Sequence, residues 1–191
     1  MTKKFFLAAL LVLAPFSAAQ AAIYAGADLM LDSVDLKSAA PQSYPQSTIG
    51  PGIHLGDRFD FLAVELGYST THKGLQQTNL RFNRLTGDGI GHVPLGGFLN
   101  LLLTAGLSQT NFGASNFIEK GYTQNGTAKT TRIATTLLSG SELDWRAGGG
   151  LSFALGEGYE LHVVGRYEPL TLRGLSSYAL SVDTGFNIDL N

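Results

Sequence analysis

The C-terminal stretch Tyr178-Ala-Leu-Ser-Val-Asp-Thr-Gly-Phe-Asn-Ile-Asp-Leu-Asn191 alternates between two kinds of residue. From Tyr178 to Leu190, every even position except Thr184 is apolar or aromatic, and every odd position is small or polar. Successive residues of a strand point to opposite faces, so this period predicts a strand with one apolar face. A helix would place Asp183 and Asp189 among the apolar residues, so the two-residue period argues against a helix. The run is longer than most strands and suits a tilted crossing of a bilayer.

The first 21 residues predict a secretory signal peptide. Lys3 and Lys4 precede an apolar run over residues 5–16, and Ala19-Gln-Ala21 forms a small-x-small cleavage site. The alternative is a membrane anchor helix, for which the apolar run is too short. We therefore expect cleavage near Ala21 and a mature chain of residues 22–191 that forms one domain.

Composition excludes several classes of protein. The chain has no cysteine, which argues against a disulfide-stapled secreted domain. Without Lys3 and Lys4 it carries 11 basic and 15 acidic residues, which argues against nucleic acid as a partner. No segment after the signal peptide has enough consecutive apolar residues for a transmembrane helix. An exported chain of alternating strands fits a closed barrel, because closure leaves no unpaired backbone edge in the bilayer.

Similar alternation recurs along the chain and predicts eight antiparallel strands, over residues 23–31, 48–56, 61–70, 78–93, 98–108, 142–155, 159–168 and 178–190. Pro51 suggests a bulge in the second strand. In the fourth strand the alternation is lost around residues 85–90, where a second bulge would restore it.

The connections between these strands alternate in length. Short turns are expected at residues 56–60, 94–97 and 156–158, and longer loops at residues 32–47, 71–77, 109–141 and 169–177. The predicted fold is an all-β, eight-stranded antiparallel transmembrane β-barrel, with short periplasmic turns and long extracellular loops. Aromatic residues near the strand ends are expected to form girdles at the membrane interfaces: Tyr68, Trp145, Tyr159, Tyr167 and Tyr178.

Three segments, residues 61–68, 145–151 and 165–168, resemble small outer membrane barrels of the OmpA/OmpX and opacity-like type. This resemblance implies an outer membrane location, folding by the outer membrane assembly machinery and a monomeric barrel. Two features differ from the family pattern. The chain ends in Leu190-Asn191 rather than in an aromatic residue, and no peptidoglycan-binding domain follows the barrel.

Seven charged or titratable residues are predicted to face the lumen: Asp28, Glu65, Arg146, His162, Arg166, Glu168 and Asp183. A barrel of eight strands is filled by its own side chains, so these groups must find partners there. The simpler interpretation is a structural network of ion pairs, in which Arg146 and Arg166 reach toward Asp183. The alternative is a narrow gated channel in which an arginine exchanges carboxylate partners.

The four histidines, His54, His72, His92 and His162, lie on four different elements without the spacing of metal ligands. We therefore predict no metal site, no cofactor and no catalytic residues. A lipid-modifying enzyme is the least favoured alternative, because it would need a histidine beside a serine and an acid near one rim.

Basic residues at the surface end of the second hairpin and in the longest loop are candidates for contact with lipopolysaccharide phosphates: Lys73, Arg81, Arg84, Lys120, Lys129 and Arg132. The predicted role is therefore structural, with surface loops that are free to contact host or envelope proteins. A porin-like channel remains the main alternative.

Overall fold

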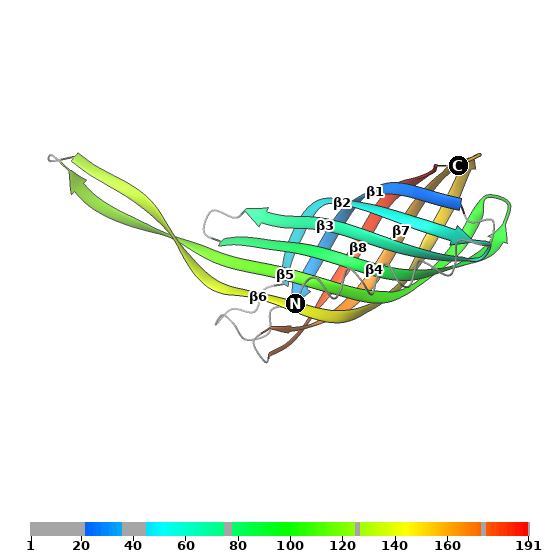
Figure 1. Cartoon of the computed structure of the whole chain (residues 1–191). Coiled ribbons are helices and arrows are strands. Elements are labelled where there is room, and N and C mark those ends of the chain that lie inside the picture. Colours follow the sequence, from blue (N-terminus) through cyan, green and yellow to red (C-terminus); the bar gives the residue numbers. More distant parts are fainter. Residues whose placement is uncertain (1–21, 36–44, 75–77, 125–126, 173–174, 191) are drawn as a thin grey trace.

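The structure is a computed structural model that describes residues 22–35, 45–74, 78–124, 127–172 and 175–190. Eight strands form a closed barrel in sequence order, as Figure 1 shows. Their bounds are β1 Ala22–Asp35, β2 Pro45–Phe59, β3 Leu62–Gly74, β4 Thr78–Gly96, β5 Leu99–Gln124, β6 Thr127–Gly156, β7 Tyr159–Leu172 and β8 Leu175–Asp189. Antiparallel pairing of β1 with β8 closes the barrel. The predicted fold class is confirmed.

Three tight turns join the strands at one end of the barrel. Asp60 adopts a positive φ of 54° between β2 and β3, and Gly97 adopts 59° between β4 and β5. Gly158 does the same between β6 and β7, with a φ of 77°. Glycine suits such positions because it has no Cβ to clash with the backbone. β1 begins and β8 ends at this same end, which is the periplasmic end in the predicted orientation.

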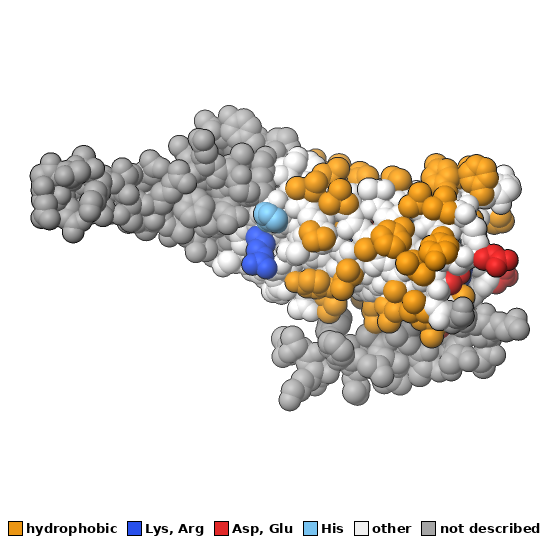
Figure 2. Space-filling view, turned by 90° about the horizontal axis from the view of Figure 1, so that it is seen from above, with side chains coloured by type: hydrophobic (Ala, Val, Ile, Leu, Met, Phe, Trp, Pro, Cys, Tyr) orange, Lys and Arg blue, Asp and Glu red, His pale blue; other side chains and the backbone are white. Residues whose placement is uncertain are grey.

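The alternation predicted for the strands sorts their side chains between lipid and lumen. On β8, Leu180, Val182 and Phe186 are exposed, whereas Ser181 and Asp183 are buried. Exposed hydrophobic side chains occur on all eight strands and form a belt, part of which is visible on the face shown in Figure 2. Such a belt on the outer surface, with polar residues inside, is the pattern of a transmembrane barrel.

Outward-facing aromatic residues gather at the extracellular end of β6, β7 and β8. The rings of Trp145 and Tyr167 lie 5.7 Å apart, and Tyr167 stacks on Tyr178 at 5.9 Å. Tyr159 is exposed near the opposite end. These positions fit the predicted girdles, where amphipathic rings lie between hydrocarbon and water.

The two predicted bulges are wrong. Around Pro51 the register between β1 and β2 runs without a shift, and β2 keeps the same register with β3 on both sides of Pro51. β4 likewise pairs regularly with β3 and β5 through residues 85–90, and its irregularity lies between Pro94 and Gly96. The even positions of β4 from Leu80 to Ile90 are therefore all buried in the lumen, including Phe82.

The predicted long loops are largely strand. Most of residues 109–141 belongs to β5 and β6, which pair from Leu99↔Phe153 to Gln124↔Thr127 and extend beyond the other strands in Figure 1. Likewise β1 runs to Asp35 and β2 begins at Pro45, while β7 and β8 occupy most of residues 169–177. The connections themselves, residues 36–44, 75–77, 125–126 and 173–174, lie outside the described residues.

The predicted signal peptide, residues 1–21, also lies outside the described residues and stays a prediction. In the described part of the chain, no helix is long and apolar enough to cross a membrane.

Candidate functional site

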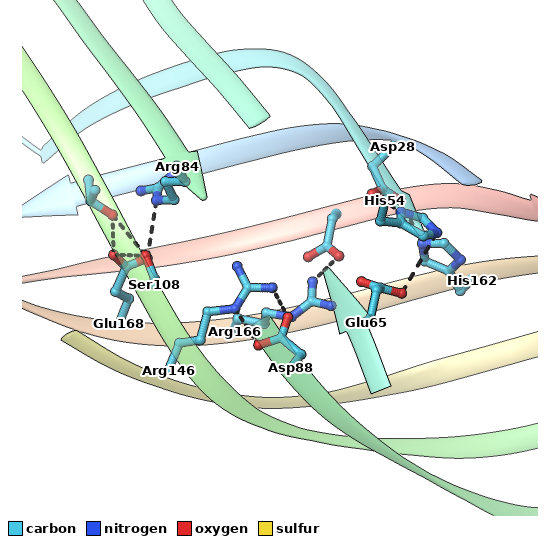
Figure 3. A network of polar contacts seen from close by, with 12 residues as sticks. Asp28, His54, Glu65, Arg84, Asp88, Ser108, Arg146, His162, Arg166 and Glu168 are labelled. Carbon is cyan, nitrogen blue, oxygen red and sulfur yellow. Dashed lines mark hydrogen bonds and ion pairs between the residues drawn. The ribbon is translucent and has the colours of Figure 1, made fainter. Parts of the chain in front are cut away.

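The candidate site is the lumen of the barrel, where inward-facing side chains form stacked layers. All seven predicted lumen residues face this interior; Asp28 is half-buried and the other six are buried. The inward positions of β1 give the order of the layers from the periplasmic end: Tyr24, Gly26, Asp28, Met30, Asp32 and Val34. Figure 3 shows the polar contacts within these layers.

The upper ion-pair layer is centred on Arg84, whose side chain is 1% exposed. Arg84 Nη1 donates to Asp32 Oδ2 at 2.7 Å, and its Nε lies 3.1 Å from Glu168 Oε2. Thr71 donates to Asp32 at 2.6 Å, while Ser108 and Thr110 donate to Glu168 at 2.8 and 2.6 Å. The layer thus joins β1, β3, β4, β5 and β7 across the lumen. Buried charges are stable only with such partners.

The central ion-pair layer contains two arginines and two aspartates. Arg146 Nε donates to Asp88 Oδ1 at 2.8 Å, and its Nη2 pairs with Asp88 Oδ2. Arg166 pairs with Asp183 through Nη1, and its Nε lies 4.0 Å from Asp88 Oδ2. The predicted bridge from Arg166 to Asp183 is therefore present. The prediction that Arg146 also reaches Asp183 is wrong, because Asp88 binds both ends of its guanidinium.

The histidine cluster, defined as Asp28, His54, Glu65 and His162, lies toward the periplasmic end. Asp28 joins two imidazoles: His54 Nδ1 lies 2.8 Å from Oδ2 and His162 Nε2 lies 2.7 Å from Oδ1. His54 Nε2 lies 2.6 Å from Asn187 Oδ1 and 3.7 Å from Glu65 Oε2. Tyr24 donates to Glu65 at 3.2 Å. Two carboxylates and two imidazoles thus share one layer.

Glycines on the intervening strands make room for three of these contacts. Gly106 is in register between Asp88 and Arg146, and a Cβ there would lie 2.2 Å from Asp88 Oδ1. Gly185 occupies the same position between Asp28 and His162, with a Cβ 2.1 Å from Asp28 Oδ1. A side chain at either position would occupy the space in which the partners meet.

Gly26 repeats the arrangement between His54 and Asn187. It is paired with both residues, and a Cβ there would lie 2.1 Å from His54 Nε2. The inward-facing glycines therefore help to decide which charged groups contact one another.

Each end of the lumen is also occupied. At the periplasmic end Arg58 lies over the ring of Tyr24 at 5.2 Å and pairs with Glu160 at 3.2 Å. Beyond the upper ion-pair layer lies an apolar plug of buried residues: Val34, Leu80, Phe82, Phe112, Leu170 and Ala179. Phe82 also packs against the guanidinium of Arg84.

The prediction that Arg84 contacts lipopolysaccharide at the surface end of the second hairpin is wrong, since its side chain is the centre of a buried layer. The fully continuous register of β4 turns this residue inward. Arg81, on the opposite face of β4, is exposed. The side chains of Lys73, Lys120, Lys129 and Arg132 lie outside the described residues, so their predicted contact with lipopolysaccharide stays a prediction.

Sequence reasoning omitted several residues from the lumen network: Asp32, His54, Arg58, Arg84, Asp88, Glu160 and Asn187. A detectable signal existed for most of them. His54 and Asn187 lie on the polar faces that the alternation defined, and Arg84 and Asp88 share the parity of Phe82 if β4 has no bulge. Asp32 falls in a predicted loop, because the sequence predicts that the first strand ends at residue 31.

The family model of the outer membrane protein beta-barrel domain matches residues 5–187 of the chain. The chain belongs to this family. The closed sheet, the apolar belt and the polar lumen also indicate an outer membrane β-barrel protein. A comparison with curated protein sequences gave no match.

Solved structures of outer membrane barrels share the fold at low sequence identity. Neisserial surface protein A has a TM-score of 0.65 and 16% identity, covering 89% of this chain and 99% of that one. OprG of Pseudomonas aeruginosa has a TM-score of 0.52 and 14% identity, covering 91% and 97%. Ail of Yersinia pestis, solved with the heparin analogue sucrose octasulfate, has a TM-score of 0.51 and 11% identity, covering 88% and 99%.

Proposed function

We propose that this protein is a closed, monomeric outer membrane barrel that supports the envelope and acts through its extracellular strands. The observation that carries this proposal is the occupied lumen. Arg58 and Glu160 lie at one end, the two ion-pair layers and the histidine cluster lie in the middle, and the apolar plug lies at the other end. Charged side chains that pair directly with one another in a packed interior stabilise the barrel and leave little room for ions to pass.

The extended β5–β6 hairpin supports a role at the cell surface. β4 pairs with β5 only as far as Asn116, and β7 pairs with β6 only from Ala147 onward. Farther from the barrel, the pairing described for β5 and β6 is with each other. A strand edge of this kind can add an extended segment from another protein by backbone hydrogen bonding. The proposed partner is a host or envelope protein bound through this hairpin.

Bilayer conductance tests the closed lumen. Protein purified from outer membranes and inserted into a planar bilayer should give no stepwise current, because the buried side chains of the apolar plug occupy one end of the lumen. A porin inserted by the same procedure controls for reconstitution. Reproducible single-channel steps from this protein would contradict the proposal and support the alternative, a narrow channel in which Arg166 exchanges Asp183 for Asp88.

A non-enzymatic role is part of the proposal. Lipid hydrolysis by a serine needs an adjacent histidine as general base. In the described lumen, the hydroxyl of Ser108 bonds to Glu168 and Thr110. Ser152 is in register with His162, but its hydroxyl accepts from Asn100 Nδ2 at 3.4 Å, whereas His162 bonds to Asp28. No hydrogen bond joins a serine to a histidine in the described lumen, which supports a barrel without hydrolytic activity.

We further propose that the surface end of β4 contacts lipopolysaccharide phosphates. Arg81 is exposed and lies opposite the exposed His72 on β3. Figure 2 shows a basic side chain and a histidine side chain together at the border of the hydrophobic belt. A guanidinium at this level is placed to bind phosphate groups of the outer leaflet.

Replacing Arg81 with alanine should reduce the stabilisation that lipopolysaccharide gives to the barrel. The free energy of unfolding would be measured in vesicles with and without lipopolysaccharide. We expect the difference between the two membranes to fall by about 1 kcal/mol in the variant, the usual contribution of one basic residue near an anionic surface. A variant that gains as much from lipopolysaccharide as the wild type would contradict this contact.

A further inference from the structure

The histidine cluster contains donor atoms that its own hydrogen bonds leave unused. His162 Nε2 faces Asp28 Oδ1 at 2.7 Å, and its Nδ1 is buried without a hydrogen-bond partner among the described residues. A neutral imidazole with its proton on Nδ1 carries the lone pair on Nε2, the nitrogen that faces Asp28. Asp183 also has one atom without a hydrogen-bond partner. Arg166 binds its Oδ2, whereas its Oδ1 is buried and has no partner in the described part of the chain. Both side chains are more than nine-tenths buried.

These two residues and Asp28 converge from three adjacent strands. One ring nitrogen of His162 and one carboxylate oxygen from each aspartate lie within 4.8 Å of one another. β1, β8 and β7 bring them together because Gly185 separates Asp28 from His162 without a side chain of its own. The three residues also line a cavity of about 20 Å³, together with Glu65, Arg166 and others. A space of this size holds about one water molecule or a comparably small ion.

The local charge is also suited to a cation. The described contacts pair Arg58 with Glu160, Arg84 with Asp32 and Glu168, and Arg146 and Arg166 with Asp88 and Asp183. In the same set of contacts, Asp28 and Glu65 have only imidazoles as ion-pair partners. A buried carboxylate needs a compensating charge.

We propose that His162, Asp28 and Asp183 form a binding site for a divalent transition-metal ion such as Zn²⁺ in the barrel lumen. Mixed nitrogen and carboxylate ligands favour such ions over Mg²⁺ and Ca²⁺, which take oxygen ligands. The nitrogen placed to coordinate together with Asp28 is His162 Nε2, which faces Asp28 Oδ1 at 2.7 Å, so a metal ion replaces the proton between these two atoms. Ligand atoms bound at about 2.0–2.2 Å lie at most about 4.4 Å apart. Binding therefore draws the three side chains together by a few tenths of an ångström.

The lining of the cavity indicates the route of entry. It continues from the three ligands to His92 and Glu160, which lie near the short turns of the barrel. Entry from the periplasmic end passes Tyr24 and Glu160, and it requires the ion pair between Arg58 and Glu160 to open. The apolar plug closes the opposite route.

The test measures zinc bound to tag-free protein purified in detergent from outer membranes, because an affinity tag of histidines would itself bind metal. After equilibrium dialysis against Zn²⁺, we expect about one zinc per chain in the wild type and in the control His72→Gln, whose histidine is exposed on the outer surface. His162→Gln should lower the affinity at least about tenfold. Folding of each variant is checked by heat-dependent gel mobility.

X-ray absorption at the zinc edge provides a second readout that needs no variant, and we expect the scattering of a coordinated imidazole. Three results would overturn the proposal: a wild type that binds no zinc, a folded His162→Gln barrel that binds zinc as the wild type does, or a zinc spectrum without an imidazole. Full displacement of zinc by equimolar Mg²⁺ would also overturn it, because it would indicate an unspecific cluster of carboxylates.

Discussion

Replacing Arg84 with methionine should lower the free energy of unfolding by about 3–5 kcal/mol, the usual cost of removing one partner from a buried ion pair. The guanidinium binds Asp32 and Glu168 at 2.7 and 3.1 Å in a layer that water does not reach. Its loss leaves both carboxylates buried with only hydroxyl donors. The measurement is urea-induced unfolding from phospholipid vesicles, followed by the fluorescence of Trp145, the single tryptophan of the chain.

The matched control is Arg81→Met, on the same strand and three residues away. Arg81 is exposed, and its Nε donates only to Asn83 at 3.2 Å within the described part of the chain. An exposed contact of this kind contributes at most about 1 kcal/mol. Arg84→Lys should fall between the two, because it keeps the charge but cannot reach both carboxylates with a planar fork. Equal losses at Arg84 and Arg81 would show that Arg84 is not the centre of a buried layer.

The position of Arg84 also shows where prediction from the sequence failed. Alternation correctly predicted the eight strands and the inward direction of residues such as Arg166 and Asp183. It failed on β4 because inward positions were expected to be polar. The lumen of so narrow a barrel is packed like a protein core, so Leu80 and Phe82 face inward beside Arg84. The strand therefore needs no bulge: its inward face changes from apolar residues to charged residues along its length, while the same alternate positions continue to face inward.

The β5–β6 hairpin was missed for a different physical reason. A strand alternates in polarity only where its two faces meet different surroundings. Beyond the bilayer neither face meets lipid, so backbone pairing continues after the alternation in the sequence has ended. Residues 109–141 therefore lack the pattern of a strand although most of them pair in one.

The partners within the lumen could not be predicted because they depend on the register between strands. Asp88 and Arg146 are separated by 58 residues along the chain. They meet because both are in register with Gly106 on the strand between them. Polarity patterns identify the inward face of a strand, but the level of each residue in the barrel follows only from the pairing.

The contact between Asp88 and Arg146 should show strong coupling in a double-mutant cycle. Asp88→Asn leaves Arg146 buried without a carboxylate partner among the described residues, and should cost about 3–5 kcal/mol. Arg146→Met should cost less, because Arg166 remains 4.0 Å from Asp88 and compensates part of its charge. The double variant removes both charges, so its loss should be smaller than the sum of the single losses by about 1–3 kcal/mol.

A second cycle separates this coupling from a general loss of stability. Arg58 pairs with Glu160 at the periplasmic end, in a different layer from Asp88. The losses for Asp88→Asn and Arg58→Met should therefore add to within about 0.5 kcal/mol, as expected for residues that share no partner. Unfolding from vesicles measures both cycles under the same conditions. Equal coupling in the two cycles would mean that the lumen responds as a single electrostatic unit. The contact between Asp88 and Arg146 would then contribute no coupling beyond that of any two charged residues in the lumen. Coupling confined to Asp88 and Arg146 would instead mean that stability is divided among discrete layers, each determined by the register of its strands.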